Sequence, residues 1–153
     1  MHDLHTKAAP VLVSAAALFL GACATSNDGV VGDVAASYDA VLSGEGVVGA
    51  GDPDGFATAQ VIVKQNEGAV CYNVWNVRNI GTPTGAHIHR GTATENGPVI
   101  APLEQGSGTG WNGCVTSTEL VRDMLRAGPE SFYIQVHTTE YPRGAIRGQL
   151  SYD

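Results

Sequence analysis

Three histidines of this sequence lie in segments that alternate like β-strands, and their spacing suits a metal ion. His87 and His89 are separated by one residue. In a strand such positions point to the same face, with Cβ atoms roughly 6 to 7 Å apart. His137 ends a second apolar run at residues 132–136, which forms a strand that can lie beside the first. Three imidazoles on a β scaffold suit copper or zinc and leave a coordination position open for water or substrate.

A structural role for these histidines is the alternative. The imidazoles of His87, His89 and His137 would then hydrogen-bond to loop carbonyls and fix a polar corner of the fold. The metal hypothesis requires a strand pairing that brings His137 to the first pair. Both interpretations stay open at the level of sequence.

Other catalytic chemistry finds little support. No nucleophile-elbow pattern is present, and the five glutamates between residues 95 and 140 are scattered among turn and helix positions. The glycine-rich segments 42–55 and 106–113 lack the Lys and Ser/Thr of a phosphate-binding loop. Arg147 lies inside a predicted strand, and we expect it to hold a carboxylate or a cluster of carbonyls.

The charge balance excludes two classes of partner. The chain has 8 Lys and Arg against 15 Asp and Glu, with a formal net charge of −7. Without a cluster of basic residues, no set of phosphates can be neutralised, so we expect no nucleic-acid partner. A basic membrane-surface patch is excluded for the same reason.

The elements that must position the histidines are short strands. Apolar or alternating runs lie between turn signals at residues 38–42, 56–64, 69–77, 86–89, 131–138 and 145–152. Residues 66–68 (Asn-Glu-Gly) should turn a hairpin. This spacing is typical of an antiparallel sandwich or barrel. We expect a mainly β fold, an antiparallel Greek-key β-sandwich with one short inserted helix.

The inserted helix is predicted over residues 117–127. Leu120, Val121, Met124 and Leu125 form an apolar stripe at helical spacing, which we assign to core packing. Thr116 and Glu119 fit a capping box, and the Gly-Pro pair at residues 128–129 stops the helix.

The N-terminal segment has the layout of a secretory signal. Residues 1–7 are polar, residues 11–20 are apolar, and Leu-Gly-Ala-Cys closes the segment at Cys23. These four residues resemble the lipobox of bacterial lipoproteins, which implies that Cys23 is acylated and begins the mature chain. An ordinary cleaved signal with a cysteine nearby is the alternative.

The chain is thereby divided into three parts. We expect a lipoprotein signal peptide at 1–22, a flexible tether at 23–36 and a single β-sandwich domain at 37–153. The protein would be exported and anchored by its lipid to a membrane of the cell envelope. Because Ala24 follows the cysteine rather than Asp, that membrane would be the outer one in a diderm cell.

The remaining cysteines, Cys71 and Cys114, make an even pair in an exported chain. An oxidising compartment lets a disulfide persist, so we expect these two residues to be bridged. Two buried free thiols, or two thiolate metal ligands, are the alternatives.

Five motifs occur in order along the domain. They are Tyr-Asp-Ala-Val-Leu-Ser-Gly at 38–44, Gly-Ala-His-Ile-His-Arg-Gly at 85–91, Asn-Gly-Pro-Val at 96–99, Tyr-Ile-Gln-Val-His-Thr at 133–138 and Tyr-Pro-Arg-Gly-Ala-Ile-Arg-Gly-Gln-Leu at 141–150. Together they resemble the CHRD domain, a family named for chordin, an extracellular antagonist of bone morphogenetic proteins. The resemblance covers about residues 37–153. It implies a mainly β fold and brings no settled biochemical activity with it.

A weaker resemblance is to copper/zinc superoxide dismutase, a Greek-key sandwich with a His-x-His copper pair, a later strand histidine and a disulfide. It implies copper ligation by His87, His89 and His137. The chain departs from that family because the predicted mature chain has no further histidine for the bridging ligand and no His-rich zinc loop. The resemblance thus extends only to a copper-only centre, with Arg147 near the site, either supporting the copper ligands or guiding an anion.

Three functions follow as hypotheses. The first is a lipid-anchored cell-envelope binding protein with a mononuclear copper or zinc site, acting by ligation rather than turnover. The second is a copper-only enzyme that dismutes superoxide or handles another small oxidant. The third is a structural or interaction module that docks an envelope protein or a glycan without any metal.

Overall fold

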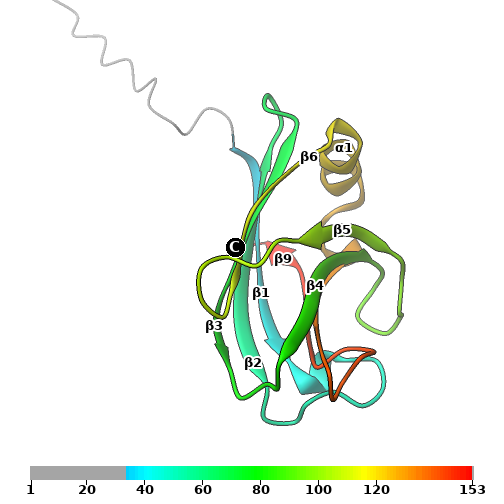
Figure 1. Cartoon of the computed structure of the whole chain (residues 1–153). Helices are drawn as coiled ribbons and strands as arrows, with labels where there is room; N and C mark the ends of the chain where they lie inside the picture. The colour runs from blue at the N-terminus through cyan, green and yellow to red at the C-terminus, as the bar shows by residue number, and fades with distance from the viewer. Residues whose placement is uncertain (1–33, 153) are drawn as a thin grey trace, which may run out of the picture.

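A computed structural model describes residues 34–152, and their fold is built almost wholly from antiparallel strands (Figure 1). The strands are β1 (Val34–Ser43), β2 (Phe56–Lys64), β3 (Ala69–Arg78), β4 (Pro83–Arg90), β5 (Val99–Leu103), β6 (Trp111–Thr116), β7 (Phe132–Thr138), β8 (Ile146–Gln149) and β9 (Ser151–Tyr152). One α-helix, α1 (Thr118–Ala127), and two 3-10 turns, η2 (Gly44–Gly46) and η3 (Pro129–Ser131), complete the described part.

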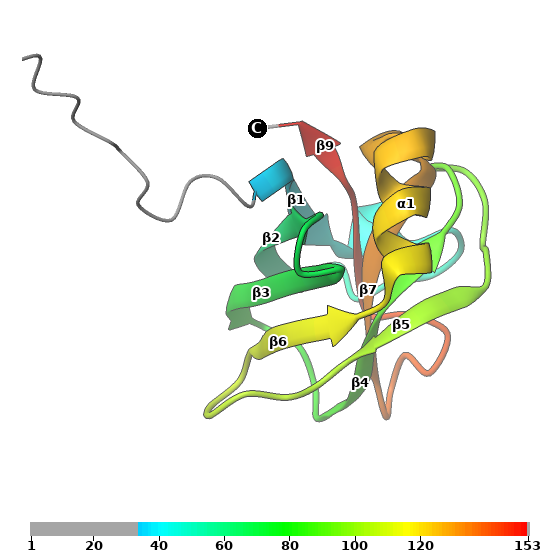
Figure 2. The ribbon, with the colours of Figure 1, turned by 90° about the horizontal axis from the view of Figure 1, so that it is seen from above.

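The strands form one continuous sheet that nearly closes on itself. Their order is β5-β4-β7-β8-β1-β2-β3-β6, and β9 also pairs with β1. The two end strands approach each other through a single bridge between Gln105 and Trp111. Seen from above, the strands surround a shared interior (Figure 2). The mainly β, antiparallel expectation is confirmed, whereas a Greek-key sandwich of two sheets is not, because hydrogen bonding runs unbroken from β5 to β6.

Alternation of side chains builds the interior. In β2 every second residue is buried, and the alternate positions are only partly covered. Apolar side chains from all the long strands meet inside the barrel, and α1 packs against them through Leu120, Val121 and Met124. Within this interior the largest fully buried residues are Tyr38, Phe132, Leu42, Ile88, Met124, Ile134, Ile146 and Leu150. This confirms that the apolar stripe of the helix is core packing.

β7 departs from simple alternation because both of its faces are buried. Tyr133 and Gln135 point away from the apolar interior and are only 1% and 3% exposed. Two loops cover them: Gln135 Nε2 donates to Arg143 O at 2.7 Å, and the Tyr133 hydroxyl accepts from Gly97 N at 3.0 Å. The outer face of β7 therefore lies beneath a second, polar layer, and this layer contains the candidate site.

Several strand boundaries differ from the sequence prediction. The strand at 56–64 and the hairpin turn before Ala69 are confirmed. The first strand already begins at Val34, inside the segment expected to be a tether, and the predicted strand at 145–152 is two strands, β8 and β9. β5 and β6 were not predicted, because Pro102 and the glycines around Trp111 hide the alternation.

The helix begins one residue later than predicted, and its cap is a different residue. Ser117 is the N-cap, with Oγ accepting from Leu120 N at 3.2 Å, so the capping box assigned to Thr116 and Glu119 is wrong. Thr116 still belongs to β6, whose ladder occupies its backbone. Gly128, at φ 78°, and the proline after it end the helix as predicted.

The disulfide between Cys71 and Cys114 is confirmed. The two residues lie directly opposite each other on β3 and β6. No helix within residues 34–152 has the length and apolarity needed to cross a membrane. Cys23, the signal peptide at 1–22 and most of the tether lie outside the described residues.

Candidate metal centre

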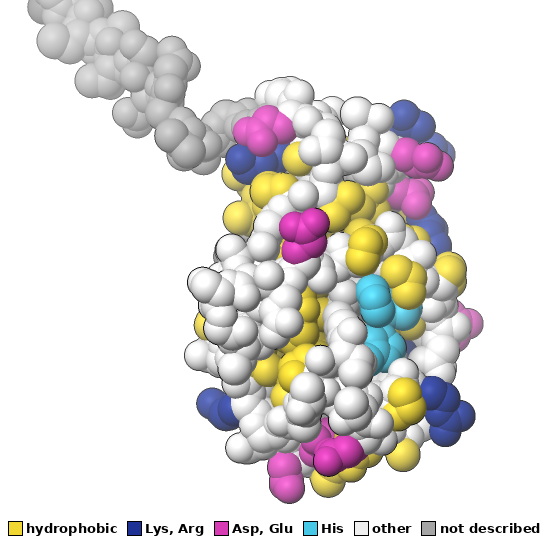
Figure 3. Space-filling model, in the orientation of Figure 1, with side chains coloured by type: hydrophobic (Ala, Val, Ile, Leu, Met, Phe, Trp, Pro, Cys, Tyr) yellow, Lys and Arg dark blue, Asp and Glu magenta, His cyan; other side chains and the backbone are white. Residues whose placement is uncertain are grey.

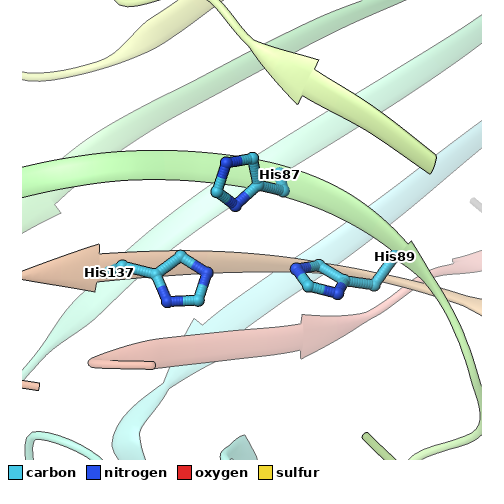
Figure 4. A group of neighbouring side chains, drawn as sticks. All are labelled: His87, His89 and His137. Carbon is cyan, nitrogen blue, oxygen red and sulfur yellow. The ribbon is translucent and has the colours of Figure 1, made fainter. Parts of the chain in front are cut away.

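Pairing between β4 and β7 brings the three histidines together. The register sets His89 opposite Tyr133, His87 opposite Gln135 and Gly85 opposite His137. His137 is therefore the diagonal neighbour of His87, and no side chain stands on Gly85 to separate them. The three rings point toward one another from the two strands (Figure 4). The strand pairing that the metal hypothesis required is present.

The ring nitrogens are close enough to share one ion. One ligand atom from each histidine lies within 4.8 Å of the other two. The ring centroids of His87 and His137 are 5.1 Å apart, and His89 lies 5.8 Å from His87 and 6.1 Å from His137. Ligands of a tetrahedral metal at about 2.0 to 2.1 Å are separated by roughly 3.4 Å. The separations of these nitrogens, at most 4.8 Å, are near that value.

Backbone carbonyls fix the tautomer of two of the rings. His89 Nδ1 lies 2.9 Å from Gly97 O, and His137 Nδ1 lies 3.1 Å from Pro142 O. A carbonyl oxygen can only accept, so in each neutral ring Nδ1 carries the proton and Nε2 keeps a free lone pair. Both Nε2 atoms, and Nδ1 of His87, are buried and have no hydrogen-bond partner. Metal-binding histidines commonly have this arrangement, with one ring nitrogen hydrogen-bonded and the other free to bind the ion.

Burial and neighbouring charge favour the neutral imidazoles. Burial lowers the pKa of His87 below its usual value, and His137 and His89 lower it further. Burial also lowers the pKa of His89, as do His137 and Arg147, although the Gly97 carbonyl opposes them. A metal ion requires the unprotonated ring, so these shifts prepare His87 and His89 for ligation at neutral pH.

Two stacked side chains, Tyr133 and then Arg147, support His89 from behind. The ring of Tyr133 lies parallel to that of His89, with centroids 4.7 Å apart. The Arg147 guanidinium carbon lies 3.5 Å from the centroid of Tyr133. Arg147 is only 1% exposed; its Nη2 donates to Thr92 O and its Nη1 to Asn96 Oδ1. Arg147 thus binds hydrogen-bond acceptors of the loop, and it packs against His89 only through the ring of Tyr133.

Tyr133 was not singled out from the sequence. The signal was present, since Tyr133, Gln135 and His137 occupy positions i, i+2 and i+4 of one strand and must share a face. What the spacing did not reveal is which histidine would pair opposite Tyr133.

The histidines open to solvent on one side. They line a hollow of about 300 Å³ together with Thr84, Gly85, Val99 and Pro142. Figure 3 shows the histidine side chains at the molecular surface. The rest of this lining is uncharged, and Arg147 is not part of it. A fourth coordination position would face this hollow.

The donor set therefore suits a single borderline metal ion. Three imidazole nitrogens with one open position are a ligand arrangement that zinc and copper both accept. The residues within residues 34–152 that could jointly hold an ion in this way are His87, His89 and His137.

Comparison with known proteins agrees with the motifs in strands β1, β4, β7 and β8. The model of the CHRD domain matches residues 38–150. No curated protein and no solved structure matches the chain. Because the matched segment covers most of the chain and nearly all of the described fold, the chain belongs to the CHRD domain family.

Proposed function

We propose that this CHRD-domain protein binds a single copper or zinc ion through His87, His89 and His137, and that it does so as an exported, lipid-anchored protein of the cell envelope. It acts by ligation rather than by turnover. The anchor would be Cys23, on the strength of the Leu-Gly-Ala-Cys sequence at the end of the apolar leader.

The observation that carries the proposal is the hydrogen bonding of the rings. If the histidines were purely structural, their buried nitrogens should all have partners, because an unsatisfied buried polar atom costs about 1 to 3 kcal/mol. Here each ring keeps one buried nitrogen without a partner, and the rings turn these nitrogens toward one another (Figure 4). A bound ion would satisfy all three at once.

The open side of the site supports binding more than catalysis. A dismutase needs a cation to guide its anionic substrate, and Arg147 was the candidate. Arg147 lies under Tyr133 and outside the lining of the hollow. No charged side chain among the described residues lines the approach. The surroundings of the site therefore favour metal binding over superoxide turnover.

Metal content tests this function. Full-length protein extracted in detergent would be analysed by elemental mass spectrometry and by calorimetric titration with Cu(II) and Zn(II). We expect one ion per chain, lost in the double variant His87→Ala/His89→Ala. Val99→Ala, which trims the same hollow without removing a ligand, is the matched control and should bind normally.

Two outcomes would change the conclusion. Equal metal content in wild type and the double variant would place the ion elsewhere and reject this site. Superoxide turnover by the copper-loaded wild type, absent from the double variant, would favour the enzyme over the binding protein.

A further inference from the structure

We propose that the outer face of β1, β2 and β3 binds a neutral glycan chain, at a site separate from the histidines. Figure 2 shows β2 and β3 on one side of the barrel and β4 and β7 on the other. The two sites share no residue, so one can fail while the other stands.

The face carries a transverse row of polar side chains, which we call the polar row. It consists of Ser151, Asp39, Gln60, Asn73 and Asn112, each directly opposite the next on β9, β1, β2, β3 and β6. Neighbouring strands are about 4.8 Å apart, so five strands extend this row over roughly 19 Å. A ligand that follows the row would be an extended chain that crosses the strands.

An aromatic side chain stands beside the polar row. Trp75 lies opposite Thr58, which lies opposite Val41, so these three form the next row on the same face. Trp75 is 38% exposed and Val41 is 63% exposed. Trp75, Val41 and Thr58 line a hollow of about 460 Å³ together with Asp39, Gln60 and Ser151 of the polar row. That volume is in the range of small-molecule sites.

The polar groups of this face are largely free to bind a ligand. The side chains of Gln60 and Asn73 make no hydrogen bond within residues 34–152, and Asp39 forms no ion pair there. Two hydroxyls of the face are occupied. That of Thr58 donates to Trp75 O at 3.3 Å and accepts from Asn76 Nδ2 at 3.2 Å, and that of Ser151 donates to Asp39 O at 3.3 Å. The Thr58 contacts hold the backbone at Trp75 and leave the amides of the row available.

The chemistry of the face selects a sugar over other ligands. A pyranose ring has an apolar face, which can pack against an indole, and hydroxyls, which need both donors and acceptors. Trp75 supplies the apolar surface, and the amides of Gln60 and Asn73 supply both donors and acceptors. No Lys or Arg lines the hollow, so phosphate and other anions have no partner. Of the exposed large hydrophobic residues in the described part, Val41 and Trp75 line the hollow, which is too few for a stable protein interface.

Titration with defined oligosaccharides tests the proposal on the full-length protein in detergent. The probes are the tetramers of β-1,4-linked N-acetylglucosamine, β-1,4-linked glucose and α-1,4-linked glucose. Trp75 reports binding by its fluorescence, because the other tryptophan, Trp111, is only 2% exposed and gives a constant background. We expect saturable binding of at least one tetramer, with an affinity unchanged between about 0.05 and 0.5 M NaCl, since no ion pair is involved.

Variants locate the site. Trp75→Ala should weaken binding at least tenfold by calorimetry, and Gln60→Ala should weaken it severalfold. Val48→Ala, an exposed apolar change outside the hollow, is the matched control and should bind as wild type. His87→Ala/His89→Ala should retain full glycan binding while losing metal.

Three results would overturn the proposal. One is the absence of binding of every tetramer at about 10 mM, where even a weak site would be filled. Another is binding that survives both Trp75→Ala and Gln60→Ala. The third is self-association of the wild type that Trp75→Ala abolishes, because the face would then be an interface between copies of this chain.

Discussion

The aromatic ring of Tyr133 lies within 10° of parallel to the imidazole of His89, and its hydroxyl accepts a hydrogen bond from the backbone of Gly97. The carbonyl of the same glycine lies 2.9 Å from Nδ1 of His89. Tyr133 therefore constrains His89 twice, through the plane of its ring and through the carbonyl that fixes its tautomer. His137 has one such constraint, from the carbonyl of Pro142.

Tyr133 should tune metal affinity without binding the ion. Groups that orient a ligand typically change affinity by about 10- to 100-fold when they are removed. We expect Tyr133→Leu to lower copper or zinc affinity about tenfold or more, and Tyr133→Phe, which keeps the stack but loses the hydroxyl, to have a smaller effect. Competition titration against a chelator measures both. Equal affinity in wild type and Tyr133→Leu would show that the stack does not orient His89.

Arg147 should matter more for stability than for metal binding. Its guanidinium is buried, stacks on Tyr133 and donates to Thr92 O and Asn96 Oδ1 in the loop that covers β7. Arg147→Met leaves those acceptors without their donor, which costs about 1 to 3 kcal/mol of unfolding free energy. Urea denaturation measures this loss. Arg143→Ala, at an exposed position of the same Arg-Gly-Ala-Ile-Arg segment, is the control and should stay close to wild type.

Removing the disulfide should destabilise the fold and spare the site. The bridge joins β3 to β6, across a sequence separation of 43 residues, while the histidines lie on β4 and β7. Loop-closure models give about 3 to 4 kcal/mol for such a loop. We expect Cys71→Ser/Cys114→Ser to lose up to this amount in chemical denaturation and to keep wild-type metal stoichiometry. Loss of metal binding in a folded double variant would contradict the separation of the two features.

The metal-free protein should become less stable below pH 6.5. Burial lowers the folded-state pKa of both His87 and His89, and the nearby His137, together with Arg147 for His89, adds to that effect. Below about pH 6.5 the unfolded chain then binds more protons than the folded one. The unfolding free energy therefore decreases as the pH is lowered, and this decrease ends once the pH is below the folded-state pKa values. Above pH 6.5 this contribution is constant.

Denaturation of chelator-treated protein at a series of pH values measures this dependence. His87→Ala/His89→Ala serves as the comparison and should show a shallower slope between pH 5 and 6.5. The opposite slope in wild type, with stability rising as the pH falls, would show that the folded state favours the imidazolium forms.

Much of the fold could be predicted from local pattern. The hairpin from Phe56 through Val77 and the helix before Gly128 follow from period-two and period-3.6 alternation and from turn residues, which act over a few residues. The disulfide could be predicted from the number of cysteines in the expected mature domain. β5 and β6 were missed because proline and glycine obscure the alternation, and their strand character comes from the partners β4 and β3.

The sequence by itself determined that His87 and His89 share a face, because a strand places residues i and i+2 on the same side. The sequence also contains the family motifs and has an acidic composition without a cluster of basic residues. Only the tertiary structure decided that His137 joins the pair, since the register of β4 against β7 depends on residues about 50 positions apart. The tertiary structure also decided that the sheet nearly closes into a barrel and that Arg147 stacks on Tyr133. Both depend on contacts between distant strands and loops, which local alternation does not specify.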